Sequence, residues 1–391
     1  MAQRFAIYLD ANAGLPLKPQ VKEKIIEWCE HSADYGNPSS VHVFGRKSKQ
    51  AILRATDSVL ASIGAGDRKR PIGKLYFTSS GTEANQWIIR SALKEDTLWI
   101  SNSLEHDSVQ AEFARQQSNT RFLSVPVENS GQLGTAEFLK KFLKQNSDSP
   151  ILISQMWVNH ETGVINDLTA LIEMRRRHQN LLIHVDCAQG WGKLEFSSYL
   201  LEADYLTFSG PKIGSLHGVG CAWVKNGAPL VSLFPGHQQH GLRGGTEFLL
   251  PILSVGWAAE GLLDHQQLKA TQSIIALKRN RLEQELVARL GVEVNGGSLD
   301  RVSNTLNITI EGISSQSLIS RVDLRGFAIS SGSACSAGTG EPSPVLMAMG
   351  RTQEQALASV RISLKGNETD EELQNFVEVF CDEVRKLRDY S

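Results

Sequence analysis

The chain has 391 residues, and because a single hydrophobic core rarely grows beyond ~250–300 residues, two domains are expected. Hydrophobic residues make up 41% and charged residues 21%, the balance of an ordinary globular protein. The 40 lysines and arginines and 42 aspartates and glutamates give a net charge of −2. This charge argues against nucleic-acid binding through general positive charge.

The N-terminal residues and the cysteines indicate a reducing compartment. The stretch MAQRFAIYLDANAG has neither a long apolar run nor an Arg- and Ser-rich presequence before a strand-like segment at 5–9. We therefore expect a cytoplasmic protein, and no membrane partner, because no apolar run approaches the ~18–20 residues that span a bilayer. The five cysteines, at 29, 187, 221, 335 and 381, contain no CxxC pair. That spacing excludes the usual zinc ribbon or finger, and no resident metal is expected.

Short apolar runs alternate with helix-like segments between about residues 74 and 225. The runs lie at 75–77, 97–100, 121–127, 151–158, 181–186, 205–210 and 219–224. This alternation predicts an α/β fold with a largely parallel sheet that helices cover on both faces. Ligands of such sheets bind at the carboxyl ends of the strands.

The pattern changes after residue 246. Long helical stretches are expected at about 247–263 and 270–290, strands at 304–310, 327–333 and 359–364, and a final helix from about 369. These elements predict a smaller α+β domain that the N-terminal segment joins. The predicted division is a large domain of residues 15–260 and a small domain of residues 1–14 and 261–391.

Two segments contain candidate ligand-binding groups: the first could bind an anion, and the second could bind a positively charged ring. TSSGTEAN, at 78–85, lies between a strand and a helix, where N–H groups and the Thr82 hydroxyl make either an anion site or a simple helix cap. Asp186 ends a buried strand in HVDCAQGWGK, at 184–193. A buried carboxylate needs a partner. The partner is either structural, a cation or a helix cap, or it is the protonated ring nitrogen of a cofactor. Gln189 could reach the same cofactor.

Lys212 and Cys335 are candidates for covalent chemistry. Lys212 follows an apolar strand and lies in a turn of glycines and serines. Most lysines are solvated surface charges, but one at this position is a candidate for a Schiff base. Cys335 lies among serines, alanines and glycines after a strand. Such a loop predicts an exposed, reactive thiol, whereas the other four cysteines lie in apolar contexts and are interpreted as structural.

Arg361 and His106 complete the candidates. Arg361 is flanked by apolar residues in SVRISL, so it needs either a structural ion pair or a substrate carboxylate. His106 follows a strand, where its imidazole could stack on a planar ring or move protons. Taken together, these residues are the parts that pyridoxal phosphate chemistry requires.

The motifs resemble the cysteine desulfurases of the class V aminotransferase family, within the fold-type I pyridoxal phosphate enzymes. The resemblance rests on YLDANAGLP at 8–16, GNPSSVHVFG at 36–45, FTSSGTEAN at 77–85, LEHDSV at 104–109, VNHETGVIND at 158–167, HVDCAQ at 184–189, LRGGTE at 242–247, SSGSACSAG at 330–338 and SVRISL at 359–364. It implies a large domain with a mostly parallel seven-stranded sheet and a smaller domain that carries the catalytic cysteine loop. The long loop after the cysteine resembles group I of the family, which supplies iron–sulfur cluster assembly and tRNA thiolation.

The resemblance implies a site for pyridoxal 5'-phosphate. Lys212 would hold the cofactor and move protons, Asp186 would pair with the ring nitrogen, and Gln189 would contact the ring hydroxyl. His106 would stack on the ring, and Thr246 would reach the phosphate from the neighbouring subunit of a homodimer. The implied cofactor-binding residues are Gly81, Thr82, His106, His160, Asp186, Gln189, Ser209, Lys212 and Thr246.

The resemblance also implies the substrate and the sulfur chemistry. Arg361 would grip the carboxylate of L-cysteine, with Asn37 and Asn159 as further substrate-binding residues. Cys335 would attack the substrate sulfur, which leaves a persulfide on the enzyme and releases L-alanine. The sulfur would pass to an acceptor protein, such as an iron–sulfur scaffold or a tRNA thiolation protein, and Cys335 could also serve as a transient iron–sulfur ligand.

Two residues depart from the family's pattern. Pro211 replaces a phosphate-binding histidine before the lysine, and proline offers neither an imidazole nor an N–H. His160 replaces the second asparagine of VNNE, which lies near the ring hydroxyl. Two alternatives stay open: a selenocysteine lyase or other class V lyase, and a degenerate sulfur-transfer scaffold. Retention of Cys335 favours the desulfurase over the lyases, and only Pro211 and His160 support the scaffold.

Overall fold

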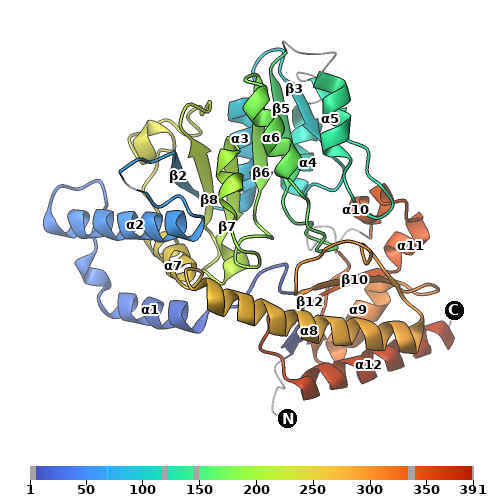
Figure 1. The fold of residues 1–391 in the computed structure, drawn as a ribbon. Coiled ribbons are helices and arrows are strands. Elements are labelled where there is room, and N and C mark those ends of the chain that lie inside the picture. The colour runs from blue at the N-terminus through green and yellow to red at the C-terminus, as the bar shows by residue number, and fades with distance from the viewer. Residues whose placement is uncertain (1–5, 68, 117–120, 144–148, 333–339, 390–391) are drawn as a thin grey trace.

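The computed structural model describes residues 6–67, 69–116, 121–143, 149–332 and 340–389 (Figure 1). Within these residues the chain forms a seven-stranded, a three-stranded and a two-stranded sheet. The strands are β1 (Ile7–Tyr8), β2 (Gly73–Thr78), β3 (Leu98–Ser101), β4 (Arg121–Ser124), β5 (Ile151–Met156), β6 (Leu181–Asp186), β7 (Tyr205–Ser209), β8 (Gly220–Lys225), β9 (Glu293–Val294), β10 (Thr305–Thr309), β11 (Phe327–Ala328) and β12 (Ser359–Ser363). The α-helices are α1 (Pro19–Glu30), α2 (Val43–Ser62), α3 (Gly81–Ala92), α4 (Asp107–Gln116), α5 (Thr135–Leu143), α6 (Thr169–Arg177), α7 (Leu249–Glu260), α8 (His265–Leu290), α9 (Ser315–Leu324), α10 (Pro344–Ala348), α11 (Gln353–Leu357) and α12 (Asp370–Asp389).

The large sheet has the strand order β2-β8-β7-β6-β5-β3-β4, and the predicted mostly parallel seven-stranded sheet is confirmed. Strand β8 runs antiparallel to both of its neighbours, β2 and β7, and the other described strand pairs of this sheet are parallel. Residues of β5 alternate between two cores: Ile151 and Ile153 pack in one, and Leu152 in the other. Helices α3 and α4 pack together on the Leu152 side, while α5 and α6 contribute to the other core. A strand buried on both faces needs this nearly continuous apolar sequence.

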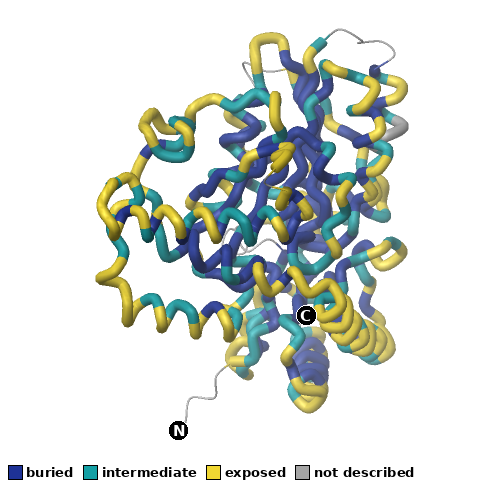
Figure 2. Tube along the Cα trace, turned by 60° about the vertical axis from the view of Figure 1, so that its left-hand side comes forward, coloured by how far each residue is buried: buried dark blue, intermediate teal, exposed yellow. Residues whose placement is uncertain are grey.

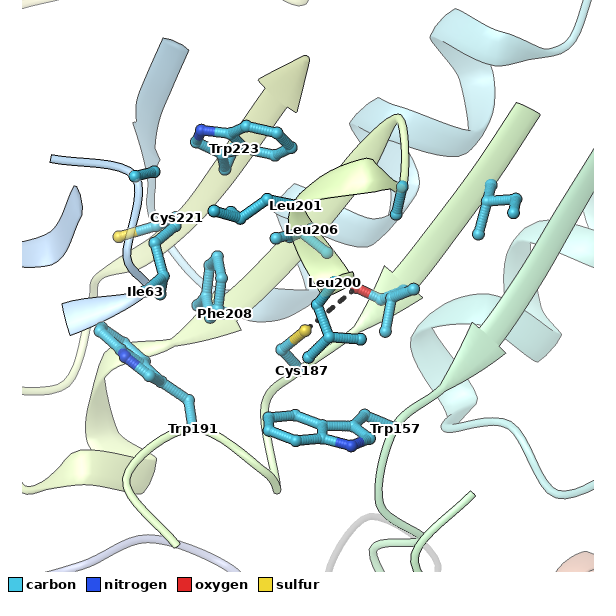
Figure 3. Packing of buried hydrophobic residues seen from close by; sticks show 14 of the residues in the cluster. Ile63, Trp157, Cys187, Trp191, Leu200, Leu201, Leu206, Phe208, Cys221 and Trp223 are labelled. Atoms are coloured by element: carbon cyan, nitrogen blue, oxygen red, sulfur yellow. Dashed lines mark hydrogen bonds between the residues drawn. The ribbon is translucent and has the colours of Figure 1, made fainter. Parts of the chain in front are cut away.

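Tryptophans, phenylalanines and cysteines fill the core beneath one face of the large sheet. Figure 3 shows Trp157, Trp191 and Phe208 around Cys187, whose thiol donates to the carbonyl oxygen of Val185 at 3.8 Å. Burial raises the pKa of the Cys187 thiol far above its usual range, so it is a poor nucleophile. Cys187, Cys221 and Cys381 are buried, which supports their interpretation as structural cysteines. Cys29 on α1 is exposed, contrary to the expectation that it lies in an apolar context.

The three-stranded sheet β12-β10-β9 is antiparallel and forms a separate core with α8, α9 and α12. The N-terminal segment joins this core through Leu9, and β1 pairs in parallel with β11. Buried residues concentrate in the centre of the molecule, and exposed ones lie on the surrounding helices and loops (Figure 2). The domain boundaries proposed from the sequence stay a prediction.

Two elements of the smaller core differ most from their expected bounds. Helix α8 begins at His265 rather than near 270, because the Asp264 side chain caps it by accepting the Gln267 N–H at 2.9 Å. Strand β11 ends at Ala328 rather than at 333, because Ser330 pairs instead with Arg361 in an isolated bridge. No helix in the described ranges combines the length and apolar character that a membrane crossing requires.

Candidate active site

A cavity of about 250 Å³ lies where the carboxyl ends of β6 and β7 meet the first turns of α3 and α4. The N-terminal segment and β12 contribute further walls, so residues from both cores surround it. The predicted residues that line the cavity are Gly81, Thr82, His106, His160, Asp186, Gln189, Ser209, Lys212 and Arg361. Carboxyl ends of parallel strands gather loops at one edge of a sheet, which explains why segments so far apart in sequence converge here.

The first turn of α3 lines this cavity, and the first N–H groups of a helix have no partner within the helix. The Ser80 side chain caps the helix by accepting the Glu83 N–H at 3.1 Å. Gly220 lets β8 approach this turn closely, because a Cβ at Gly220 would stand 2.3 Å from the Ser80 carbonyl carbon. Gly81 and Thr82 begin the helix beside Ser209. The turn is therefore both a helix cap and a wall of the cavity that is suited to an anion.

Asp186 receives its hydrogen bonds from neutral donors. Asn85 Nδ2 donates to Asp186 Oδ2 at 2.7 Å, and the Ala188 N–H donates to Oδ1 at 2.9 Å. Asn85 also donates to Ser108 Oγ at 2.8 Å, which ties the carboxylate to α4. Sequence reasoning missed Asn85, although it lies three residues after Thr82 and so on the same face of one helix.

Two buried histidines face each other in the cavity. The rings of His106 and His160 have centroids 5.2 Å apart and planes inclined by 75°. Ser108 N–H donates to His106 Nδ1 at 3.1 Å, which leaves Nε2 to carry the proton of the neutral ring. Burial lowers the pKa of His106, and burial followed by the charge of nearby groups lowers the pKa of His160 further. Both rings are therefore neutral at pH 7 and able to accept a proton.

Lys212 lies in a short 3₁₀ turn, Gly210–Ile213, directly after β7. Its Nζ donates to the carbonyl oxygens of Asn12 at 2.6 Å and Ala13 at 2.8 Å. The turn ends at Gly214, whose φ of +80° is left-handed. The N-terminal segment therefore holds the amine at the cavity, and Asn12 is a second residue that sequence reasoning missed.

Arg361 forms the ion pair that is one of its two predicted alternatives, and the substrate-binding alternative stays a prediction. Its side chain is 2% exposed, and its guanidinium donates to Asp10 Oδ1 at 2.7 Å and to the His160 carbonyl oxygen at 3.0 Å. It thus forms a structural ion pair, yet it also lines the cavity. Its Nε is buried and has no hydrogen-bond partner in the described residues, so one donor is left for a ligand.

The remaining predicted residues lie elsewhere. Thr246 and Asn37 are exposed and do not line the cavity of their own chain. Asn159 is buried, and its Oδ1 accepts the N–H groups of Glu161 and Thr162. Its Nδ2 donates to the Leu104 carbonyl oxygen. The Asn159 amide therefore stabilises a turn and does not line the cavity. Cys335 lies outside the described residues.

Comparison with known proteins shows full-length similarity to one family. Residues 7–376 match the family described as "Aminotransferase class-V". The chain is 33% identical over 391 residues to a cysteine desulfurase of Cereibacter sphaeroides, covering 98% of this chain and 96% of that one. A NifS-like protein from Rickettsia africae has a TM-score of 0.86 at 29% identity, covering 97% of this chain and 99% of the other. A structure titled "SspA in complex with cysteine" has a TM-score of 0.75 at 26% identity, covering 93% and 99%.

Proposed function

Because the chain belongs to the class V aminotransferase family and to the cysteine desulfurases within it, we propose that its cavity binds pyridoxal phosphate and L-cysteine. The enzyme is a cysteine desulfurase, and its family depends on pyridoxal phosphate. The observation that carries the residue assignment is the convergence of three groups on one cavity: the Lys212 amine, the Asp186 carboxylate and the first turn of α3. An amine, an anion and an anion-binding turn fit the aldehyde, the ring nitrogen and the phosphate of this cofactor.

Bound pyridoxal phosphate would supply an electron sink for the bonds to the substrate Cα. Around it, Lys212 would bind covalently and carry protons, while Asp186 would keep the ring nitrogen protonated. The first turn of α3, with Thr82 and Ser209, would hold the phosphate. The low pKa of His106 supports a role as a proton acceptor, because a neutral imidazole can take a proton that a charged one cannot.

Arg361 would bind the carboxylate of L-cysteine, in competition with Asp10. In the sulfur step, the Cys335 thiolate would attack the substrate Sγ, and the electron pair of the Sγ–Cβ bond would remain on Cβ. A proton delivered to Cβ gives alanine, and Cys335 keeps the sulfur as a persulfide. An acceptor protein, for iron–sulfur cluster assembly or for thiolation, would then receive that sulfur in the cytoplasm. Thr246 would complete the phosphate site from the partner subunit of a homodimer.

The test is incubation with L-cysteine and a thiol reductant, with alanine and sulfide measured together. A desulfurase releases equal amounts of both, since each turnover breaks one Sγ–Cβ bond. Alanine and selenide from selenocysteine, with no products from cysteine, would favour a selenocysteine lyase. Absence of products from both substrates, together with no cofactor absorbance, would favour a sulfur-transfer scaffold.

Replacing Asp186 by Asn should lower kcat by at least ~10²-fold, the scale of losing one preorganised electrostatic partner. The amide keeps the size of the side chain but removes the charge that keeps the ring nitrogen protonated. Steady-state kinetics measures the effect. Asp167→Asn, at an exposed carboxylate outside the cavity, is the control and should leave kcat unchanged. Near-normal turnover of the Asp186 variant would remove this residue from the proposed role.

Replacing Pro211 by His should strengthen cofactor retention during dialysis by roughly tenfold to a hundredfold, the value of one hydrogen bond to a charged group. The Pro211 carbonyl oxygen accepts the Leu15 N–H at 2.9 Å, and any residue at this position can keep that bond. Pro211→Ala is the matched control, because it restores the N–H without the imidazole. If all three proteins retain the cofactor equally, other donors already compensate for the missing histidine.

A further inference from the structure

Lys193 is a half-buried lysine beside the cavity that the proposed chemistry does not use. It lies one turn after Gln189, at the end of the segment HVDCAQGWGK. Its Nζ donates to Gln189 Oε1 at 2.6 Å and to Asn12 Oδ1 at 2.7 Å. Both acceptor residues line the cavity, whereas Lys193 does not. Burial, and then the charges of Lys212 and Arg361, hold the pKa of Lys193 well below its usual range. Placing an amine here is therefore costly, and its contacts indicate what it does.

The amine decides which way two side-chain amides point. It donates to both of them, so the atom of each amide that faces it is the oxygen. The Gln189 Nε2 therefore lies on the other side, where it donates to the Asn12 carbonyl oxygen at 2.9 Å. An amide NH₂ has two N–H groups, so one N–H of Gln189 remains for a ligand. Asn12 is oriented in the same way, and its Nδ2 donates to the His160 carbonyl oxygen at 3.2 Å.

Asn12 connects this arrangement to Lys212. Its carbonyl oxygen accepts from both Gln189 Nε2 and Lys212 Nζ, the latter at 2.6 Å. Its Nδ2 also donates to Thr305 Oγ1 at 2.9 Å, and Asn304 Nδ2 donates to its Oδ1 at 3.1 Å, which anchors the segment to β10. A change at Lys193 therefore reaches the cavity through two residues that touch it.

We propose that Lys193 is a positioning residue, which turns the amide of Gln189 so that an N–H, and not the carbonyl oxygen, faces the ring oxygen of the bound cofactor. The inference rests on the proposed function, in which this cavity binds pyridoxal phosphate. The ring oxygen carries negative charge, so an N–H donor stabilises it and a carbonyl oxygen repels it. Without Lys193, both orientations of the Gln189 amide become accessible.

The test is titration of the apoprotein with pyridoxal phosphate, followed by absorbance, for wild type and Lys193→Met. Methionine keeps most of the length and the apolar stem of the lysine but cannot donate. We expect cofactor affinity to fall about tenfold, the value of about one hydrogen bond. The pH midpoint of the absorbance change should move upward, because a lost donor no longer favours the deprotonated oxygen. Lys193→Gln, which restores an N–H donor, should recover most of the affinity.

Two further variants separate positioning from general damage. Lys225→Met is the matched control, since Lys225 is a half-buried lysine that donates to the Glu202 carbonyl oxygen at 2.9 Å, outside the cavity. It should bind the cofactor as the wild type does. In a Gln189→Leu background, Lys193→Met should cause little additional loss, because the amide through which it acts is gone.

The outcomes distinguish the inference from the function on which it rests. Wild-type affinity and midpoint in Lys193→Met would overturn the inference, as would an equal loss in the Gln189→Leu background. Wild-type protein that develops no absorbance with pyridoxal phosphate would instead overturn the proposed cofactor site, and the inference with it.

Discussion

Lys212→Ala should abolish turnover of L-cysteine and the absorbance band of the lysine-bound cofactor. The side chain is the amine at the cavity that the Asn12 and Ala13 carbonyl oxygens hold in place. Its removal takes away both the covalent attachment and the proton carrier. Proton transfer by a positioned group alone contributes about 10²–10⁴-fold, so we expect kcat to fall by more than about 10³-fold.

Borohydride reduction followed by peptide mapping measures the attachment directly. Wild-type protein should carry the reduced cofactor on the peptide that contains Lys212. Lys225→Ala removes a lysine from the end of β8 outside the cavity, and it should leave the adduct and the turnover intact. A lysine adduct that borohydride still reduces in Lys212→Ala would move the attachment to another lysine.

Cys335→Ser should bind L-cysteine and the cofactor but release no sulfide. The thiolate is the group that would take the sulfur, and a serine hydroxyl at this position is far less nucleophilic. The groups proposed to bind cofactor and substrate, Lys212, Asp186 and Arg361, are unchanged in this variant. Mass spectrometry of wild-type protein after treatment with cysteine should find one additional sulfur atom on the peptide that contains Cys335.

The described cysteines provide the control for this experiment. Burial raises the pKa of the thiols of Cys187, Cys221 and Cys381, which makes them poor acceptors of sulfur. Cys29 is exposed on α1, so Cys29→Ser is the matched variant and should keep full activity. Sulfur on Cys29 or Cys187, or full sulfide release by Cys335→Ser, would show that the proposed sulfur step is wrong.

Local sequence patterns predicted the large sheet and the chemistry at its edge. The apolar run 181–186 ends in a carboxylate, and the run 205–210 is followed two residues later by Lys212. Residues at the ends of neighbouring parallel strands must lie at one edge of the sheet. The meeting of Asp186 and Lys212 at one cavity was therefore predictable before any coordinates were known.

Partners that come from distant segments could not be predicted in this way. Asn85 binds Asp186 from 101 residues away, and Asp10 binds Arg361 from 351 residues away. Sequence spacing carries no information on such pairs, because the packing of separate elements brings them together. Asn12 and Lys193 were missed for the same reason, although both lie in motifs that the sequence analysis quoted.

The sequence by itself determined the family, the fold class and which residue types could carry the chemistry, because motifs and apolar periodicity are local properties. Only the tertiary structure decided which of those side chains face the cavity and in which orientation. Asn159 was predicted to bind substrate, yet its amide is used in a turn, whereas Thr246 and Asn37 are exposed on their own chain. Lys193 Nζ donates to Gln189 Oε1 at 2.6 Å and to Asn12 Oδ1 at 2.7 Å, and only folding brings these groups together. Hydrogen bonds fix the direction of a side chain, and they form only once the elements have packed.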